Sequence, residues 1–119
     1  MERSSPAEVV AVYLYGSRAR GDASASSDVD LGALLRQPPV PALRGVARDV
    51  EDRVERAVRL PTQVVVLNTA PADLVHRVLR DGIVVLDRDR AVRLRFEVRS
   101  RNEYFDLEPI RRLYRRKPA

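Results

Sequence analysis

The chain has 119 residues, of which 45% are hydrophobic and 33% are charged, with a formal net charge of +5. This length and composition predict a single domain (1–119) that buries its own core, and the absence of cysteine excludes disulfide bonds and thiolate metal sites. Because the sequence shows neither an apolar leader nor an apolar run of membrane-spanning length, we expect a cytoplasmic protein with no membrane partner.

The first predicted element is a strand over Val9 to Tyr15, an aliphatic and aromatic run that ends at Gly16. Gly16 allows the backbone to approach a phosphate closely. Ser17 can donate its hydroxyl and its amide to phosphate oxygens, especially if a helix starts there. Arg18 or Arg20 is positioned to meet the negative charge of a triphosphate. These four residues are therefore the candidate nucleotide-binding residues.

A second strand is predicted over Asp28 to Leu35. Because side chains alternate along a strand, Asp28 and Asp30 are expected on one face. Two carboxylates placed in this way can share divalent cations that bridge phosphates, activate an attacking oxygen and stabilise a leaving group. Mg²⁺ is the expected ion, because the ligands would be oxygens and no His or Cys lies nearby in the sequence. Asp28 and Asp30 are the candidate catalytic and metal-binding residues.

Helices and strands alternate through the middle of the chain. Apolar residues recur at helical spacing from about Pro41 to Val58, and TQVVVL, over Thr62 to Leu67, predicts a third strand. A helix is predicted over Ala72 to Arg80, ended by Gly82, and a short fourth strand over Ile83 to Leu86. The single histidine, His76, is expected to be a surface or partly packed side chain.

The C-terminal part carries the excess positive charge. Residues 88–119 contain 11 Lys and Arg against 5 Asp and Glu, whereas residues 1–87 contain 11 against 12. A helix is predicted from Arg88 to about Tyr104, with Tyr104 and Phe105 packed as a local hydrophobic anchor, and Pro109 separating it from a last helical piece. Residues 105–119 form a basic tail. A protein partner, RNA and a plain solvated face are alternatives for it.

Gly16-Ser17, ten further residues and then Asp28-Val29-Asp30 resemble the polymerase-beta-type nucleotidyltransferase superfamily. More narrowly, GSRARGDASASSDVDLGALL looks like the minimal nucleotidyltransferase (MNT) family, and the similarity extends to VVVLNTAPADLVHRVLRDGIVVLDRD and RNEYFDLEPIRR. The resemblance implies one α/β (α+β) domain with a mixed sheet of about four strands flanked by helices, and the use of ATP with Mg²⁺. It also implies an antitoxin in a hetero-oligomer with a HEPN-domain toxin, a ribonuclease that it inactivates by transferring AMP to a tyrosine.

Gln63 departs from the family pattern. Active members typically carry a third carboxylate at this position, on the strand that corresponds to Thr62 to Leu67. A Gln carbonyl can ligate a cation, but the side chain has no charge and cannot act as a general base. Two hypotheses therefore remain open. The chain either transfers AMP to its partner toxin or is a catalytically degenerate antitoxin that neutralises the toxin by binding alone.

Overall fold

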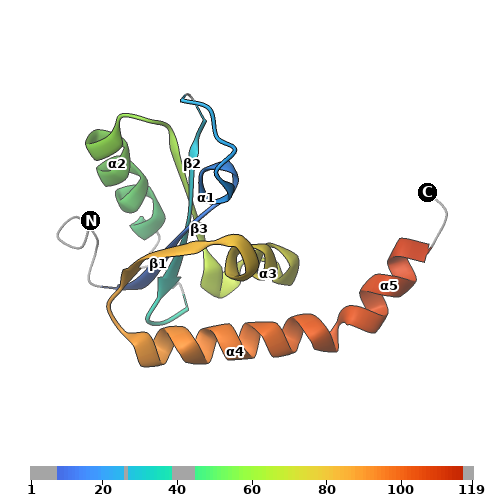
Figure 1. Cartoon of the computed structure of the whole chain (residues 1–119). Helices are drawn as coiled ribbons and strands as arrows, with labels where there is room; N and C mark the ends of the chain where they lie inside the picture. Colours follow the sequence, from blue (N-terminus) through green and yellow to red (C-terminus); the bar gives the residue numbers. More distant parts are fainter. Residues whose placement is uncertain (1–7, 26, 39–44, 117–119) are drawn as a thin grey trace.

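The computed structural model describes residues 8–25, 27–38 and 45–116. Its centre is a four-stranded sheet in the order β3-β2-β1-β4 (Figure 1), with strands β1 (Val9–Tyr15), β2 (Val29–Leu35), β3 (Thr62–Val66) and β4 (Ile83–Asp87). The sheet is mixed, because β1 runs antiparallel to both β2 and β4 whereas β2 and β3 are parallel. The expected fold class, a mixed sheet of four strands flanked by helices, is confirmed.

Helices cover both faces of this sheet (Figure 1). On one face, α2 (Val46–Val58) buries Val46, Val50 and Val54 in a cluster with residues of β1 and β2. On the other face, α3 (Ala72–Asp81) and α4 (Arg90–Asp106) pack through a second cluster. The second cluster supports the predicted nucleotide-binding residues, because Tyr15, the last residue of β1 and the neighbour of Gly16, packs against it.

Several boundaries differ from the expected ones. The helix expected from Pro41 begins at Val46, directly after Gly45, and Pro41 itself lies outside the described residues. β3 ends at Val66, because Leu67 begins a 3-10 turn (η3, Leu67–Thr69). Leu67 packs so closely over β2 that a Cβ on Gly32 would lie 2.9 Å from its side chain. The absence of a side chain at Gly32 therefore makes room for the buried Leu67.

Pro109 was expected to separate the last two helices, and this expectation is wrong. The break lies at Leu107, and Pro109 is the second residue of α5 (Glu108–Arg116). Proline is tolerated in the first turn of a helix because its missing N–H would have no acceptor there. The basic tail of residues 105–119 thus forms the end of α4 and all of α5, as far as residue 116.

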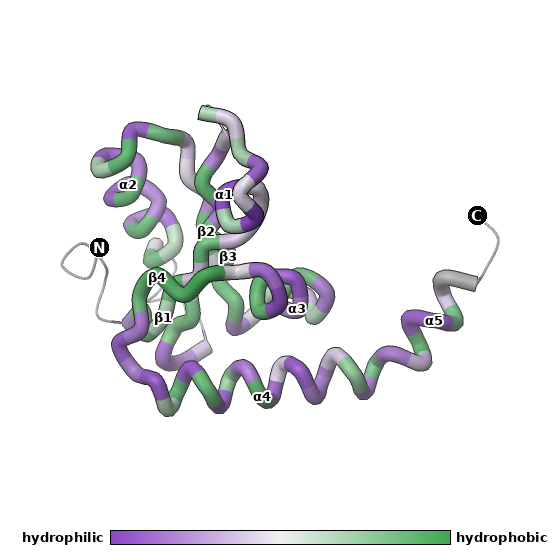
Figure 2. Tube along the Cα trace, in the orientation of Figure 1, coloured by the Kyte–Doolittle hydropathy of each residue, from purple (hydrophilic) through white to green (hydrophobic). Residues whose placement is uncertain are grey.

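The C-terminal end of α4 and all of the described α5 extend beyond the sheet (Figure 1), and Figure 2 shows hydrophilic and hydrophobic residues interleaved along both helices. Tyr104 is half-buried, as expected for an anchor, but Phe105 is 61% exposed, so the expectation for Phe105 is wrong. No helix within the described residues is both long enough and apolar enough to cross a membrane.

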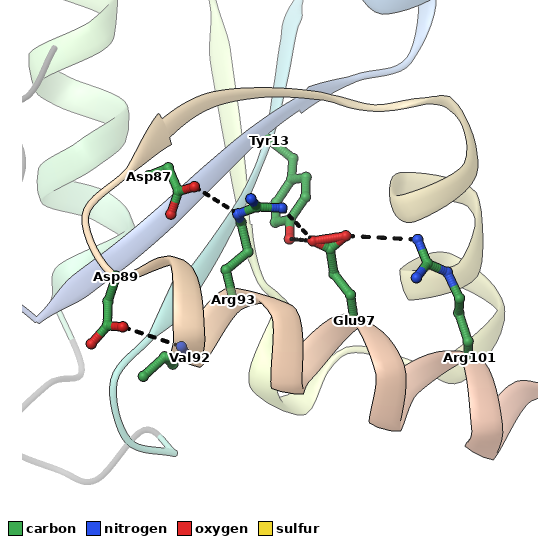
Figure 3. Close-up of polar contacts among 7 residues, drawn as sticks. All are labelled: Tyr13, Asp87, Asp89, Val92, Arg93, Glu97 and Arg101. Carbon is green, nitrogen blue, oxygen red and sulfur yellow. Dashed lines mark hydrogen bonds and ion pairs between the residues drawn. The ribbon is translucent and has the colours of Figure 1, made fainter.

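A partly buried polar network attaches α4 to the sheet (Figure 3). Arg93 donates to Asp87 of β4 over 2.9 Å and to Glu97 over 2.6 Å. Glu97 also accepts a hydrogen bond of 3.3 Å from the Tyr13 hydroxyl of β1. Burial, followed by the negative charge of Glu97, raises the pKa of Tyr13. The phenol therefore stays protonated and remains a donor that holds α4 against β1.

The outer strand β3 is held by two glutamates of α2. The Thr62 amide donates to Glu55 over 3.0 Å, and the Val64 amide donates to Glu51 over 2.9 Å. Backbone groups on the outer side of an edge strand have no neighbouring strand to bond to. The two carboxylates satisfy those amides on either side of Gln63, and so fix the position of that residue in the sheet.

Candidate active site

The turn after β1 is a tight one that only glycine adopts readily. Gly16 has φ 75° and ψ −156°, a backbone region open essentially only to glycine. A short helix, α1 (Ser17–Arg20), starts immediately after it, and its first bonds run from the amides of Ala19 and Arg20 to the Gly16 carbonyl. The amides of Ser17 and Arg18 come earlier in the chain and, like the first amides of any helix, have no acceptor within the helix. They are therefore the backbone donors available to a phosphate.

The Asp30 carboxylate lies directly over this turn. A Cβ on Gly16 would be 2.6 Å from Asp30 Oδ2, which is closer than real Cβ contacts. The contact arises because Tyr15, the last residue of β1, is the antiparallel partner of Asp30 on β2. The predicted phosphate turn and the predicted metal-binding carboxylate are thus brought together by strand pairing.

Asp28 and Asp30 form a pair of neighbouring carboxylates. Asp30 is the second residue of β2 and is half-buried, whereas Asp28 directly precedes the strand and is exposed. Partial burial raises the pKa of Asp30, and the negative charge of Asp28 raises it further. A bound cation would relieve this repulsion, so the pair is suited to hold one.

Gln63 stands next to Asp30 on the parallel strand β3, and its side chain is exposed. Residues that are partners in adjacent strands share a face of the sheet, so Tyr15, Asp30 and Gln63 form one row across β1, β2 and β3. A carboxylate at position 63 would therefore neighbour Asp30. The amide that is present offers an oxygen ligand without charge.

The side chains at this site supply too few ligands to hold Mg²⁺ by themselves, and would share the ion with a bound nucleotide. Within the described residues, no group of three or more His, Cys, Asp or Glu side chains could hold a metal ion. Asp28 and Asp30 supply two carboxylates, and Gln63 could add a neutral oxygen. Mg²⁺ is commonly held by one or two carboxylates, with waters and substrate phosphates completing its shell. The arrangement therefore fits a cation that arrives together with a nucleotide.

The two arginines of α1 have different surroundings. Arg18 donates to the Ser27 carbonyl through Nε (3.1 Å) and Nη2 (2.7 Å), and Nη2 also lies 3.4 Å from the carbonyls of Ser24 and Ala25. Its guanidinium holds the arm between α1 and Asp28. Arg20 pairs with Asp22 over 3.3 Å, and its side chain is 52% exposed. Arg20 is therefore the arginine of α1 that is more open to a ligand.

The structure adds two residues that were not among the predicted site residues. Burial and the Asp30 charge raise the pKa of Tyr15, and the positive charge of Arg77 on α3 opposes that rise. Tyr15 therefore lies close to Asp30, and Arg77 lies close to Tyr15. No local pattern marks Arg77, because its position depends on how α3 packs against the sheet.

Comparisons with known proteins agree with this geometry. Residues 3–91 match the family model of polymerase beta nucleotidyltransferases, whereas a comparison with curated proteins found no match. A chain from a crystal structure of a toxin–antitoxin complex with AMP-PNP superposes with a TM-score of 0.76 at 20% identity, over 95% of this chain and 87% of that one. A chain from the structure of tri-AMPylated Shewanella oneidensis HEPN toxin in complex with MNT antitoxin gives 0.70 at 18% identity, over 94% and 84%. At these identities the similarity establishes a common fold.

Proposed function

Because the chain belongs to the polymerase beta nucleotidyltransferase family, we propose that it is an antitoxin that binds ATP with Mg²⁺ and transfers AMP to a tyrosine of a partner HEPN toxin. The observation that carries the proposal is the Asp28–Asp30 pair lying over the Gly16 turn. The similarity in fold between this chain and chains from toxin–antitoxin complexes, one with AMP-PNP and one with an AMPylated toxin, supports the choice of partner and nucleotide. The proposal places the protein in the cytoplasm, in a hetero-oligomer with the toxin.

Each residue of the site has a role in this reaction. The amides of Ser17 and Arg18 and the Ser17 hydroxyl bind phosphate oxygens, and Arg20 adds positive charge. Asp28 and Asp30 would hold Mg²⁺, which when bound neutralises phosphate charge and lowers the pKa of the attacking hydroxyl. The tyrosine oxygen forms a bond to the α-phosphorus of ATP, and pyrophosphate leaves with the electrons of the broken bond.

The tyrosine proton has to leave during the same step. In the row across the sheet, only the Asp30 carboxylate can accept a proton, because the Gln63 amide is not a base and Tyr15 is itself protonated. A carboxylate that also binds a cation is a weak base. We therefore expect transfer to occur, but more slowly than with a third carboxylate at position 63.

The proposal is tested by incubating the chain with labelled ATP, Mg²⁺ and its cognate HEPN protein. We expect label on the toxin with the wild-type chain and none with the Asp28→Asn/Asp30→Asn variant. A control variant, Asp49→Asn/Asp52→Asn, makes the same charge change on α2 and is expected to transfer label normally. Absence of label with the wild-type chain, in a complex that forms intact, would show that it is not a transferase.

Gln63 favours a second candidate, an antitoxin that neutralises the toxin by contact alone. The site has two carboxylates, which could still hold a cation with a nucleotide, but the strand partner of Asp30 is an amide and not a third carboxylate that could act as a base. Co-expression with the toxin distinguishes the two functions. If the Asp28→Asn/Asp30→Asn variant still restores growth fully, contact is sufficient, whereas toxicity in the presence of that variant would support transfer.

A further inference from the structure

A basic pocket lies beside the candidate active site, where α3 meets the end of α4 and α5. Its volume is about 470 Å³. Four of its lining residues are basic, and these are His76, Arg77, Arg80 and Arg111. Asp73, Tyr104 and Tyr114 complete the described lining. Asp73 pairs with Arg111 over 3.7 Å, so Arg77 and Arg80 supply the positive charge that suits the pocket to an anionic group.

One wall of this pocket is preformed by a stack of three side chains. The rings of His76 and Tyr104 are parallel within 7°, with centroids 3.7 Å apart. The Arg111 guanidinium carbon lies 3.6 Å from the centroid of the Tyr104 ring. Arg111 also donates to the Tyr104 carbonyl and pairs with Glu108 over 3.4 Å, and its side chain is only 17% exposed. The stack therefore holds α5 against α3 and gives the pocket a fixed shape.

The other basic side chains are free to move toward a ligand. Arg77 and Arg80 are exposed and lie on the adjacent turn of α3. Arg80 pairs with its neighbour Asp81 over 2.9 Å, a contact at the surface that costs little to exchange. An arginine fork binds a carboxylate through two parallel hydrogen bonds, which makes such residues selective for planar anions.

α3 links the pocket to the active site. Its residues Val75 and Val78 belong to the core cluster against which Tyr15 packs. Tyr15 is the strand partner of Asp30, and Arg77, on the same helix, is close enough for its charge to act on the Tyr15 hydroxyl. A segment bound in the pocket therefore lies next to the row of residues that would perform the transfer.

We propose that this pocket is the acceptor subsite, which binds an acidic segment of the partner protein and so presents a hydroxyl of that partner to Asp28 and Asp30. The inference rests on the function proposed above and adds the chemistry that selects the acceptor. A protein segment fits better than RNA, because sites for single-stranded nucleic acid use open aromatic faces for base stacking. Both faces of the Tyr104 ring are already covered by His76 and Arg111.

The test compares the Arg77→Gln/Arg80→Gln variant with the wild-type chain. Both substitutions are at exposed positions, so the fold is expected to persist. We expect the KM for the HEPN acceptor to rise about tenfold, as for the loss of two charged contacts at an interface, and to rise more than the KM for ATP. The Arg95→Gln/Arg99→Gln variant removes the same charge from the exposed face of α4 and is expected to keep both constants.

Direct binding separates failure of this inference from failure of the proposed function. The affinity of the chain for the toxin is measured without ATP, so the result holds even if the wild-type chain transfers no AMP. We expect the Arg77→Gln/Arg80→Gln variant to bind about tenfold more weakly and to show less salt dependence. Unchanged affinity for the toxin overturns the proposal. So does a rise in the KM for ATP alone, or loss of affinity for single-stranded RNA with toxin binding retained.

Discussion

Gly16 and Asp30 are in such close contact that any side chain at position 16 would occupy the space of the Asp30 carboxylate. The phosphate turn and the metal-binding strand therefore form one unit, although 13 residues separate the two positions in the chain. A change at either residue is expected to affect the binding of nucleotide and of metal together.

Gly16→Ala is the most direct probe of that unit. The new methyl group would lie 2.6 Å from Asp30 Oδ2, so the carboxylate has to move and the binding of ATP with Mg²⁺ should be lost. The positive φ of 75° adds strain, and we expect a loss of about 1–2 kcal/mol in the free energy of unfolding. Calorimetric titration with ATP and Mg²⁺, together with urea denaturation, measures both effects.

Gly21→Ala is the matched control for this change. Gly21 also has a positive φ, of 83°, but no atom lies within 4 Å of a Cβ built there. Its loss of stability should be smaller, because Gly21, with ψ 10°, lies in the left-handed region that other residues can adopt, and nucleotide binding should persist. Equal loss of binding in both variants would contradict a specific role for the Gly16–Asp30 contact.

Asp30→Asn is expected to stabilise the fold while it abolishes metal binding. Burial and the charge of Asp28 raise the pKa of Asp30, so the folded state holds the proton more tightly than the unfolded chain. The free energy of unfolding therefore falls as pH rises from the unfolded pKa to the folded one, and stays lower at neutral pH. Because the carboxylate is only half-buried and solvent screens its charge, the gain on removing that charge should be below about 1 kcal/mol.

The pH dependence of nucleotide binding and of stability tests whether the pKa of Asp30 is raised. Protons compete with Mg²⁺ for Asp30, so affinity for the nucleotide with Mg²⁺ should decline as pH falls through the raised pKa of this carboxyl. Denaturation of wild-type and Asp30→Asn proteins across acidic and neutral pH should give curves that converge at low pH. A stability gap that persists at low pH would point to a structural role for the Asp30 side chain.

Gln63→Glu is expected to strengthen the site. Position 63 is the strand neighbour of Asp30, so the new carboxylate would be a third ligand and a base. We expect the affinity for Mg²⁺ and the rate of AMP transfer each to rise at least about tenfold. Gln37→Glu makes the same charge change in an exposed turn after β2 and should alter neither quantity. No gain at position 63 would mean that its side chain does not reach the cation.

Arg93→Ala tests the network that attaches α4 to the sheet. The change leaves Glu97, only 12% exposed, without its 2.6 Å partner and also removes the bond to Asp87 on β4. We expect a loss of about 2 kcal/mol in the free energy of unfolding, because a partly buried charge loses its closest partner and keeps only the longer contacts to Tyr13 and Arg101. Arg101→Ala removes a second arginine from the same Glu97, but that side chain is 51% exposed and 3.6 Å away. Its cost in urea denaturation should stay below about 0.5 kcal/mol.

Local patterns predicted the parts of the site that depend on short segments. The run Val9 to Tyr15 is a strand with the expected bounds, and a helix begins at Ser17, the condition under which its amide would best meet a phosphate. The contact between Gly16 and Asp30 needed the pairing of β1 with β2, which no short segment contains. The engagement of Arg18 by the arm could not be predicted either, since it depends on where the carbonyls of Ser24, Ala25 and Ser27 lie in space.

The C-terminal helices show the same limit on what short segments of sequence can predict. The polar, Arg-rich pattern predicted a helix from Arg88 to about Tyr104, and the observed helix spans Arg90–Asp106. Which of its residues are buried depends on its neighbours. Tyr104 is enclosed by His76 of α3 and Arg111 of α5, whereas the adjacent Phe105 faces solvent. Tyr104 and Phe105 are adjacent in the sequence and were therefore expected to pack together. Only tertiary packing distinguishes their environments.

The glutamates that satisfy the outer amides of β3 also affect how the protein behaves at high concentration. An open edge strand can recruit a strand of another molecule and so begin aggregation. Glu51 and Glu55 occupy the amides that such a strand would need at Val64 and Thr62. Intermolecular strand addition is therefore blocked on the side of the sheet that carries Gln63. It would have to take place at β4, where Ile83, Val84 and Val85 are exposed.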